Sequence, residues 1–188
     1  MFKKTLMTAA LALTLGTSAY AASYQIDVEG AHASINFEAS HLGYSVLTGR
    51  FDKFEGTFEY DAEKPEEGSV SVEIDMDSVN SNHGERDNHL RGDKLFDVAS
   101  NPTATFVSTG ITMIDDKTAT LTGDLTIRGE TKSVDLHTVF LGEGKDPWGG
   151  YRAGFTGHTT IQLADFGMDG LIGDAPIKLT IQVEGIRQ

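Results

Sequence analysis

The sequence predicts an all-β protein of about eight antiparallel strands, closed into an up-and-down barrel and interrupted by one short helical crossover. Three observations lead to this expectation. Apolar and polar residues alternate through most of residues 32–185, a pattern typical of strands that bury one face. Turn-forming residues separate the alternating runs, and only residues 77–101 break the alternation for long. A closed barrel is favoured over a sandwich because closure removes exposed sheet edges.

The predicted strands follow one another along the chain with short turns between them. The alternating runs are residues 32–41, 54–60, 69–77, 118–129, 133–142, 151–163 and 177–185. The turn signals lie at residues 65–68, 115–116, 128–130 and 146–150. No linker, low-complexity tract or clear repeat divides the sequence, so residues 22–188 are expected to form a single domain.

The interruption predicts a helical crossover at about residues 77–95. Its segment "NHGERDNHLRG" reads as a short polar helix in which Leu90 makes the main apolar contact. Asp77, Ser78 and Asn82 are candidates for its caps. The following Leu95 and Phe96 are expected to anchor the crossover to the barrel.

The N-terminus has the plan of a cleaved signal peptide over residues 1–21. Lys3 and Lys4 precede an apolar stretch that is too short to span a bilayer, and Ala19-Tyr20-Ala21 is a small-x-small cleavage signature. A periplasmic location is therefore expected. These lysines are the only charged residues before Ala22, so their removal takes the formal net charge from −13 to −15. Such an acidic chain is not expected to bind nucleic acid, and without cysteine it has no thiolate nucleophile or disulfide.

The apolar faces of the strands are expected to line the barrel interior. The predicted lining residues are Ile35, Phe37, Phe58, Val72, Ile74, Phe106, Leu125, Leu136, Phe140, Phe155, Ile161 and Ile181. Small residues share these faces, namely Ala33, Ala39, Gly56, Ala119, Gly123, Ala153 and Gly157. They either leave a space that holds an elongated apolar ligand or only let the strands bend.

Several motifs together resemble the YceI-like family of periplasmic polyisoprenoid-binding proteins. They are "HASINFEASHLGYSVLTGRFDKFEGTFEYD", "NHGERDNHLRGDKLFD", "NPTATF", "LTGDLTIRGETKSVDL" and "DPWGGYRAGF", which occur in this order and extend the resemblance over residues 22–188. One departure is that Leu163-Ala164 precede Asp165 where family members often carry a basic residue.

The resemblance implies a lipocalin-like barrel that binds an isoprenoid lipid or quinone and catalyses no reaction. It also implies a link to stress response and a transient contact with an inner-membrane b-type cytochrome. No metal ion or required cofactor is expected. Whether the protein carries, stores or protects its ligand, and whether it forms a homodimer, stays open.

The charged segment 83–93 is the main candidate for a different function, that of a periplasmic enzyme. The metal-ligand types in this segment are His83, Glu85, Asp87, His89 and Asp93. Their spacing does not reproduce a His-Glu-x-x-His arrangement, and arginines lie beside them. No nucleophile elbow is present in the sequence. The structural interpretation is that opposite charges at helical spacing satisfy one another. The candidates for contacts with the head of a ligand are His41, Arg86 and His89.

An outer-membrane barrel is a rival with reversed alternation, its apolar side chains facing outward. The chain has one Trp and five Tyr, too few for aromatic girdles, and it ends in Gln188 rather than in an aromatic residue. The soluble barrel with an apolar interior is therefore the prediction.

Overall fold

The structure is a computed structural model that describes residues 21–168 and 174–188. The predicted signal peptide, residues 1–21, lies outside the described residues except for Ala21. The strands are β1 (Ala22–Ile26), β2 (Ser34–His41), β3 (Ser45–Phe51), β4 (Phe54–Tyr60), β5 (Ser69–Asp75), β6 (Val79–Asn80), β7 (Thr103–Met113), β8 (Thr118–Ile127), β9 (Glu130–Lys145), β10 (Tyr151–Gln162) and β11 (Pro176–Arg187). The helices are the α-helix α1 (Gly84–Arg91) and the 3-10 turns η1 (Pro65–Glu67), η2 (Met76–Ser78) and η3 (Leu163–Phe166).

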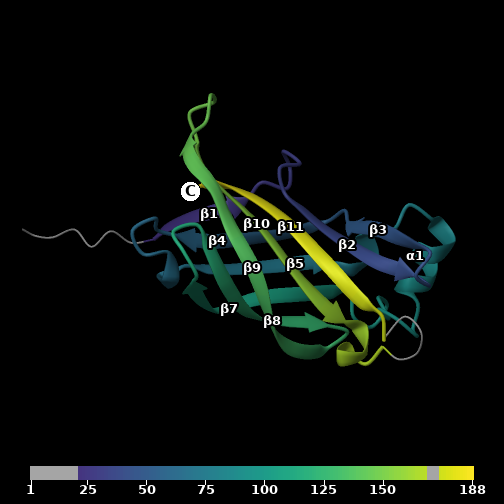
Figure 1. The fold of residues 1–188 in the computed structure, drawn as a ribbon. Coiled ribbons are helices and arrows are strands. Elements are labelled where there is room, and N and C mark those ends of the chain that lie inside the picture. The colour runs from purple at the N-terminus through teal and green to yellow at the C-terminus, as the bar shows by residue number, and fades with distance from the viewer. Residues whose placement is uncertain (1–20, 169–173) are drawn as a thin grey trace, which may run out of the picture.

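The strands form a closed eight-stranded antiparallel barrel, which confirms the predicted fold class. Its order is β1-β4-β5-β7-β8-β9-β10-β11, and β11 returns to β1 through pairs such as Tyr24 with Arg187. In Figure 1 the strands cross the barrel obliquely, with α1 at one end and the turn between β7 and β8 at the other. Each strand of the barrel turns one face inward, so the alternation of apolar and polar residues separates an inner from an outer face, as predicted.

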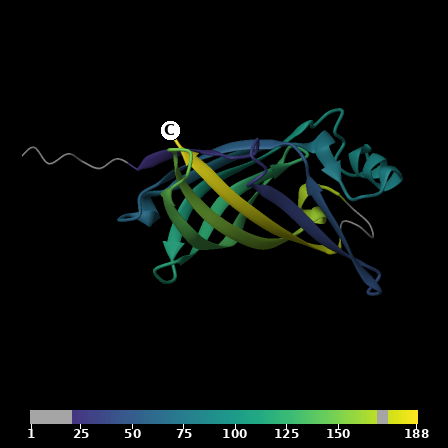
Figure 2. The ribbon, with the colours of Figure 1, turned by 90° about the horizontal axis from the view of Figure 1, so that it is seen from above.

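The remaining strands, β2, β3 and β6, extend the sheet beside the barrel. β11 is long enough to pair with β1 at residues 185–187 and with β2 at residues 177–182. β3 then pairs with β2 along its whole length and with β6 only at Arg50 and Phe51. Figure 2 shows the β2–β3 hairpin projecting past the barrel.

The crossover holds a short α-helix, as the sequence predicts for the segment of residues 82–92. The α-helix covers only Gly84–Arg91, and it follows η2 and the short strand β6. The residue that caps α1 is His83, whose ring nitrogen accepts a hydrogen bond from the backbone N–H of Arg86, and not the predicted Asp77, Ser78 or Asn82. Histidine is an uncommon cap, so the usual sequence signal for a helix start is absent here. No helix among the described residues is both long enough and apolar enough to cross a bilayer.

The crossover and η3 together close one end of the barrel. Leu95, Phe96, Phe166 and Met168 are all buried in one apolar cluster with the strand residues of that end. Arg128, in the turn between β8 and β9, ties the two segments together. Its guanidinium donates to the carbonyl oxygen of Gly167 at 2.7 Å and to that of Asp93 at 3.0 Å. The predicted anchoring role of Leu95 and Phe96 agrees with this arrangement.

Candidate functional site

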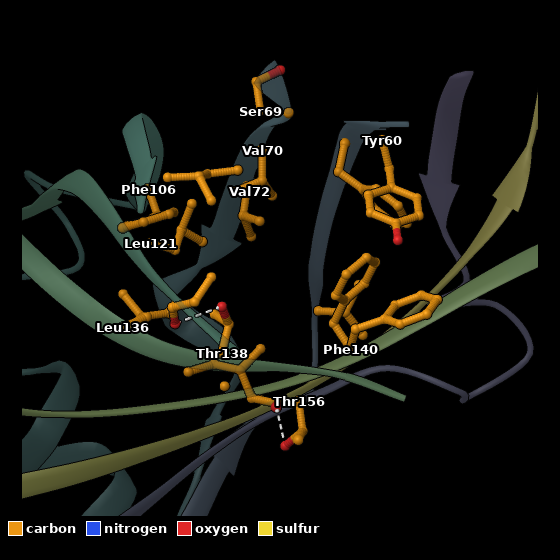
Figure 3. Close-up of a pocket in the computed structure, with 18 of the residues that line it drawn as sticks. Tyr60, Ser69, Val70, Val72, Phe106, Leu121, Leu136, Thr138, Phe140 and Thr156 are labelled. Atoms are coloured by element: carbon orange, nitrogen blue, oxygen red, sulfur yellow. Dashed lines mark hydrogen bonds between the residues drawn. The ribbon is translucent and has the colours of Figure 1, made fainter. Parts of the chain in front are cut away.

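The barrel encloses a cavity of about 230 Å³. Strands β4, β5, β7, β8, β9, β10 and β11 contribute its walls, and Ile35 of β2 adds one side chain. In Figure 3, Val70, Val72, Phe106 and Leu121 lie across the space from Tyr60 and Phe140. Tyr60 of β4 and Phe140 of β9 come from opposite sides of the barrel, and their ring centres lie 5.4 Å apart. The cavity is therefore the part of the interior that such contacts leave unfilled.

The walls are almost wholly apolar, and the hydroxyl groups of Thr138 and Thr156 are already bonded to the backbone of the barrel. The Thr138 hydroxyl donates to the carbonyl oxygen of Ala119 at 3.0 Å, and that of Thr156 donates to Ile181 at 3.2 Å (Figure 3). Among the described residues, no buried side-chain nitrogen or oxygen atom lacks a hydrogen-bond partner. The interior therefore offers hydrocarbon surface and few polar groups that need water.

Aromatic side chains concentrate on one side of the cavity. The ring of Phe155 lies 5.2 Å from that of Tyr60, 5.3 Å from that of Phe140 and 5.5 Å from that of Phe58, measured between ring centres. Edge-to-face and tilted pairs at these distances stabilise one another beyond the burial of their area. These rings come from β4, β9 and β10 and form one packed apolar cluster beside the cavity.

The cavity opens at the end away from α1. Its rim there includes Ala62, Ser69, Asp116 and Lys117, which are exposed, and the half-buried Pro65 of η1. The opposite end is filled by the cluster that contains Leu95 and Phe166. A ligand in this cavity would therefore have one end deep in hydrocarbon and the other at the rim.

Most of the predicted lining residues reach the cavity wall. They are Ile35, Phe58, Val72, Ile74, Phe106, Leu125, Leu136, Phe140, Phe155 and Ile181. Phe37 and Ile161 do not, and this part of the prediction is wrong. Both face inward but lie at the closed end, where Ile161 is buried in the core cluster and the Phe37 ring packs near Phe51.

Other lining residues were missing from the prediction. They are Tyr60, Val70, Ile111, Met113, Leu121, Val134, Leu179 and Val183, together with the rim residues. Many of them lie two positions from a predicted lining residue on the same strand, as Leu179 and Val183 flank Ile181. The same alternation could have found these, because every second residue of a strand faces the same side.

The predicted head-group contacts are not at the cavity. His41 is exposed at the end of β2, and His89 is exposed on α1. Arg86 donates instead to the hydroxyl and carbonyl oxygen of Ser81, at 2.8 Å and 2.7 Å. None of these side chains lines the cavity, and α1 lies at the closed end. The structure therefore contradicts these assignments, because the barrel opens at its other end.

The charged segment holds the crossover together, in agreement with the structural interpretation. Asp87 is buried and accepts hydrogen bonds from the backbone N–H and the hydroxyl of Ser81. Burial alone would raise the pKa of Asp87, but these hydrogen bonds and the nearby arginines keep it below its usual range. Arg91 donates to the carbonyl oxygens of Asp77 and Val79. These groups satisfy one another and leave no converging set that faces a substrate space.

A second charged cluster lies where β1, β10 and β11 meet. Asp27, His32 and Glu184 bring ligand atoms within 4.8 Å of one another, a spacing that suits a metal ion. However, the Arg152 guanidinium already lies 2.6 Å from both Asp27 and Glu184, and it bonds Asp146 as well. Its hydrogen bond lowers the pKa of Asp27 to about 2. The arginine thus supplies the positive charge that a metal ion would otherwise provide.

The fold and the cavity define a small β-barrel protein with an apolar internal pocket, and comparisons with known proteins give its family. A family model described as a YceI-like domain matches residues 24–185, so the chain belongs to the YceI-like family. The chain is 51% identical to a UPF0312 protein of Azotobacter vinelandii and 49% identical to one of Pseudomonas aeruginosa, and each match covers 100% of both chains.

Solved structures share the fold. The YceI protein of Campylobacter jejuni is 30% identical with a TM-score of 0.71, over 79% of this chain and 90% of that one. BcnA of Burkholderia cenocepacia is 22% identical with a TM-score of 0.75, over 85% of this chain and 98% of that one. A domain of Saccharophagus degradans described as polyisoprenoid-binding is 18% identical with a TM-score of 0.65, over 89% of this chain and 99% of that one.

Proposed function

We propose that the protein binds an amphiphilic isoprenoid lipid, of the polyprenyl or isoprenoid-quinone type, in the barrel cavity and does not transform it chemically. Binding would serve carriage, storage or protection of the lipid in the periplasm, where the N-terminal residues 1–21 would direct the chain. A role in stress response, contact with a b-type cytochrome and self-association stay predictions that rest on the family resemblance.

The observation that carries this proposal is the apolar cavity itself. It lies inside a closed barrel, it is open at one end, and the hydroxyl groups of Thr138 and Thr156 in its wall are bonded to the backbone. Such a space excludes charged metabolites, because an unpaired charge is costly to bury. It fits a hydrocarbon chain whose polar end stays at the rim. The polyisoprenoid-binding description of the Saccharophagus degradans domain, which shares the fold, supports the isoprenoid class.

The energetics favour reversible binding. Burying hydrocarbon from water gains about 0.8 kcal/mol per methylene group. The tail of such a lipid has a bilayer as its alternative, and transfer from one apolar environment to another gains almost nothing by the hydrophobic effect. The protein would therefore release its ligand slowly into water and readily into membranes, as a carrier requires.

Native mass spectrometry tests the proposal. The full chain is expressed in a Gram-negative host, recovered by osmotic shock, and analysed before and after incubation with lipid vesicles. We expect an adduct that lipid extraction identifies as an isoprenoid and that vesicles remove. A protein without adduct that also takes up no isoprenoid from loaded vesicles would contradict the proposal.

A matched pair of variants locates the binding. Gly157 lines the cavity, and a Cβ added there would meet neighbouring atoms only at 3.5 Å or more, so Gly157→Leu should place its side chain in the cavity and abolish the adduct. Gly110 has nothing within 4 Å of an added Cβ and lies outside the cavity, so Gly110→Leu should retain the adduct. Circular dichroism confirms that both variants fold. Equal loss or equal retention of the adduct in the two folded variants would contradict binding in the cavity.

A further inference from the structure

The rim of the cavity is strongly acidic. Two connections form it, the one after β4 with η1 and the turn between β7 and β8. The carboxylates at the rim are those of Glu59, near the end of β4, and of Asp61, Glu63, Glu66, Glu67, Asp115 and Asp116 in the two connections. The ammonium groups there are those of Lys64 and Lys117. The carboxylates clearly outnumber the ammonium groups, so the rim repels an anion.

Local contacts keep this negative charge in place. Lys64 is paired with Glu67 at 3.1 Å, and this contact raises the pKa of Lys64. The pair cancels one charge of each sign, so among these described rim residues only Lys117 opposes the other carboxylates. The Asp115 carboxylate accepts hydrogen bonds from the backbone N–H groups of Lys117 and Thr118, at 2.9 Å and 2.8 Å. These bonds lower the pKa of Asp115, so it stays ionised well below neutral pH.

Tyr60 provides a neutral hydrogen-bond donor beside this rim. It ends β4 and lines the cavity, and its ring packs at 5.4 Å from that of Phe140 (Figure 3). Burial, with a further contribution from the charge of Glu143, raises the pKa of Tyr60. The hydroxyl therefore stays protonated, and it can donate to an oxygen atom at the end of a ligand tail.

One hollow on the outside of the barrel adjoins the cavity wall and also carries more carboxylates than lysine and arginine side chains. This shallow hollow lies over β9, β10 and β11 and shares Phe155 and Val183 with the cavity wall. Its charged lining residues are Glu143, Asp146 and Glu184 against Lys145 and Arg152, with His32 beside them. Arg152 is already bonded to Asp146 and Glu184. A tail that left through this wall would thus also bring its head to an acidic surface.

From this arrangement we infer that the cavity selects isoprenoids with a neutral, oxygen-bearing head, such as an alcohol or a quinone, over those that end in phosphate or diphosphate, and that Tyr60 donates a hydrogen bond to that oxygen. The inference rests on the proposed function and specifies the class of its ligand. A phosphate monoester carries about −1.5 to −2 charges at pH 7, and a diphosphate brings at least as much to the same rim.

Two ligands with the same tail test the head-group selectivity. Farnesol and farnesyl diphosphate are titrated into delipidated protein at low ionic strength, with EDTA present so that no divalent cation bridges the diphosphate to carboxylates. We expect farnesol to bind at least about tenfold more tightly, and the difference to narrow as salt screens the rim. Equal or tighter binding of the diphosphate would overturn the inference and leave lipid binding intact. Failure of farnesol and of its hydrocarbon analogue farnesane alike would overturn the proposed function itself.

Charge variants show whether the rim is the cause. Glu63→Lys combined with Glu66→Lys changes exposed rim residues that do not line the cavity. It should raise the affinity for farnesyl diphosphate and leave that for farnesol unchanged. Glu85→Lys combined with Glu130→Lys makes the same change in net charge on exposed residues at the closed end. It should leave both affinities unchanged. If both double variants gained the same affinity for farnesyl diphosphate, or if neither gained any, the charge of the rim would not be the cause of the head-group selectivity.

Tyr60→Phe tests the hydrogen bond, because it removes the hydroxyl and keeps the ring. The net free-energy contribution of one hydrogen bond corresponds to roughly a three- to tenfold change in affinity. Farnesol binding should weaken by about this factor, and farnesane binding should stay the same. Equal weakening for both ligands, or none for farnesol, would overturn the role of Tyr60.

Discussion

At the scale of single residues, aromatic rings cover several of the barrel glycines. A Cβ added to Gly123 would lie 2.3 Å from the ring of Phe106, and one added to Gly185 would lie 2.3 Å from the ring of Phe58. The sequence leaves open whether Gly123 leaves space or only lets its strand bend, and the ring of Phe106 excludes the first alternative. Gly157 does line the cavity. Composition cannot separate the two cases, because the register between strands decides which ring lies over which glycine.

The contacts of Gly123 and Gly157 predict effects of different size for the same substitution to alanine. Gly123→Ala forces a methyl group against the Phe106 ring and against the Val107 carbonyl oxygen at 2.8 Å, and it should cost about 1–3 kcal/mol of unfolding free energy. Gly157→Ala makes only ordinary contacts and should change stability by less than about 1 kcal/mol. Urea unfolding followed by circular dichroism measures both. A similar loss in both variants would show that the ring over Gly123 moves aside freely.

Asp27 gives the fold a dependence on acid pH. Its carboxylate accepts hydrogen bonds from Arg152 and His32, and its pKa falls from 3.8 to about 2 on folding. A lowered folded pKa stabilises the protein above the unfolded value, and this stabilisation, at most about 2 kcal/mol, is lost as the pH falls from 4 toward 2. Asp27→Asn should therefore lower stability at pH 7 and flatten the profile in this range. Asp124→Asn, on the exposed face of β8, should leave the profile unchanged.

At the scale of elements, the sequence predicts the strands better than the ends of the barrel. Alternation fixes which face of a strand is buried, but it is the same at both ends of the strand. It therefore could not show that Phe37 and Ile161 lie at the plugged end and Phe140 near the open one. The crossover was predicted correctly as an anchor through Leu95 and Phe96. The structural interpretation of its charged residues also agrees with the structure. Only Arg86 and His89 of this crossover were wrongly named as candidate contacts with the ligand, because nothing local in the sequence states which end of the barrel the helix covers.

Arg128 is expected to hold the two segments that close the barrel end, residues 93–97 of the crossover and residues 163–168 with η3. Arg128→Ala removes the hydrogen bonds to Asp93 and Gly167, and it should cost about 1–3 kcal/mol. Hydrogen exchange should quicken in residues 93–97 and 163–168 and stay unchanged in η1. Arg128→Lys keeps the charge but cannot donate through a planar fork, so it should show most of the same effect. Full protection in Arg128→Lys would assign the effect to charge rather than to the two bonds.

At the scale of the whole molecule, charge and shape divide the barrel into a plugged end and an open acidic end. The acidic composition was visible in the sequence, and it already excluded nucleic acid as an expected partner. Its concentration at the rim was not visible, because residues 59–67 and 115–117 are far apart in the chain and meet only through the pairing of β5 with β4 and β7. The acidic rim is therefore formed by strand pairing between distant parts of the chain, which local sequence patterns do not reveal.

The volume of the cavity predicts a limit on tail length. A cavity of 150 Å³ holds one benzene molecule, so about 230 Å³ has room for roughly nine carbon atoms, close to two isoprene units. We expect the affinity to rise steeply between alcohols with one and two isoprene units, by at most about 4 kcal/mol in binding free energy. It should then stay level for alcohols with three and four units. Leu121→Ala enlarges the cavity from its wall and should shift the plateau to longer tails. Calorimetric titration of the series checks both effects. A constant gain per unit through the fourth would mean that the walls part to admit longer tails, and that the volume seen here is the closed state of the barrel.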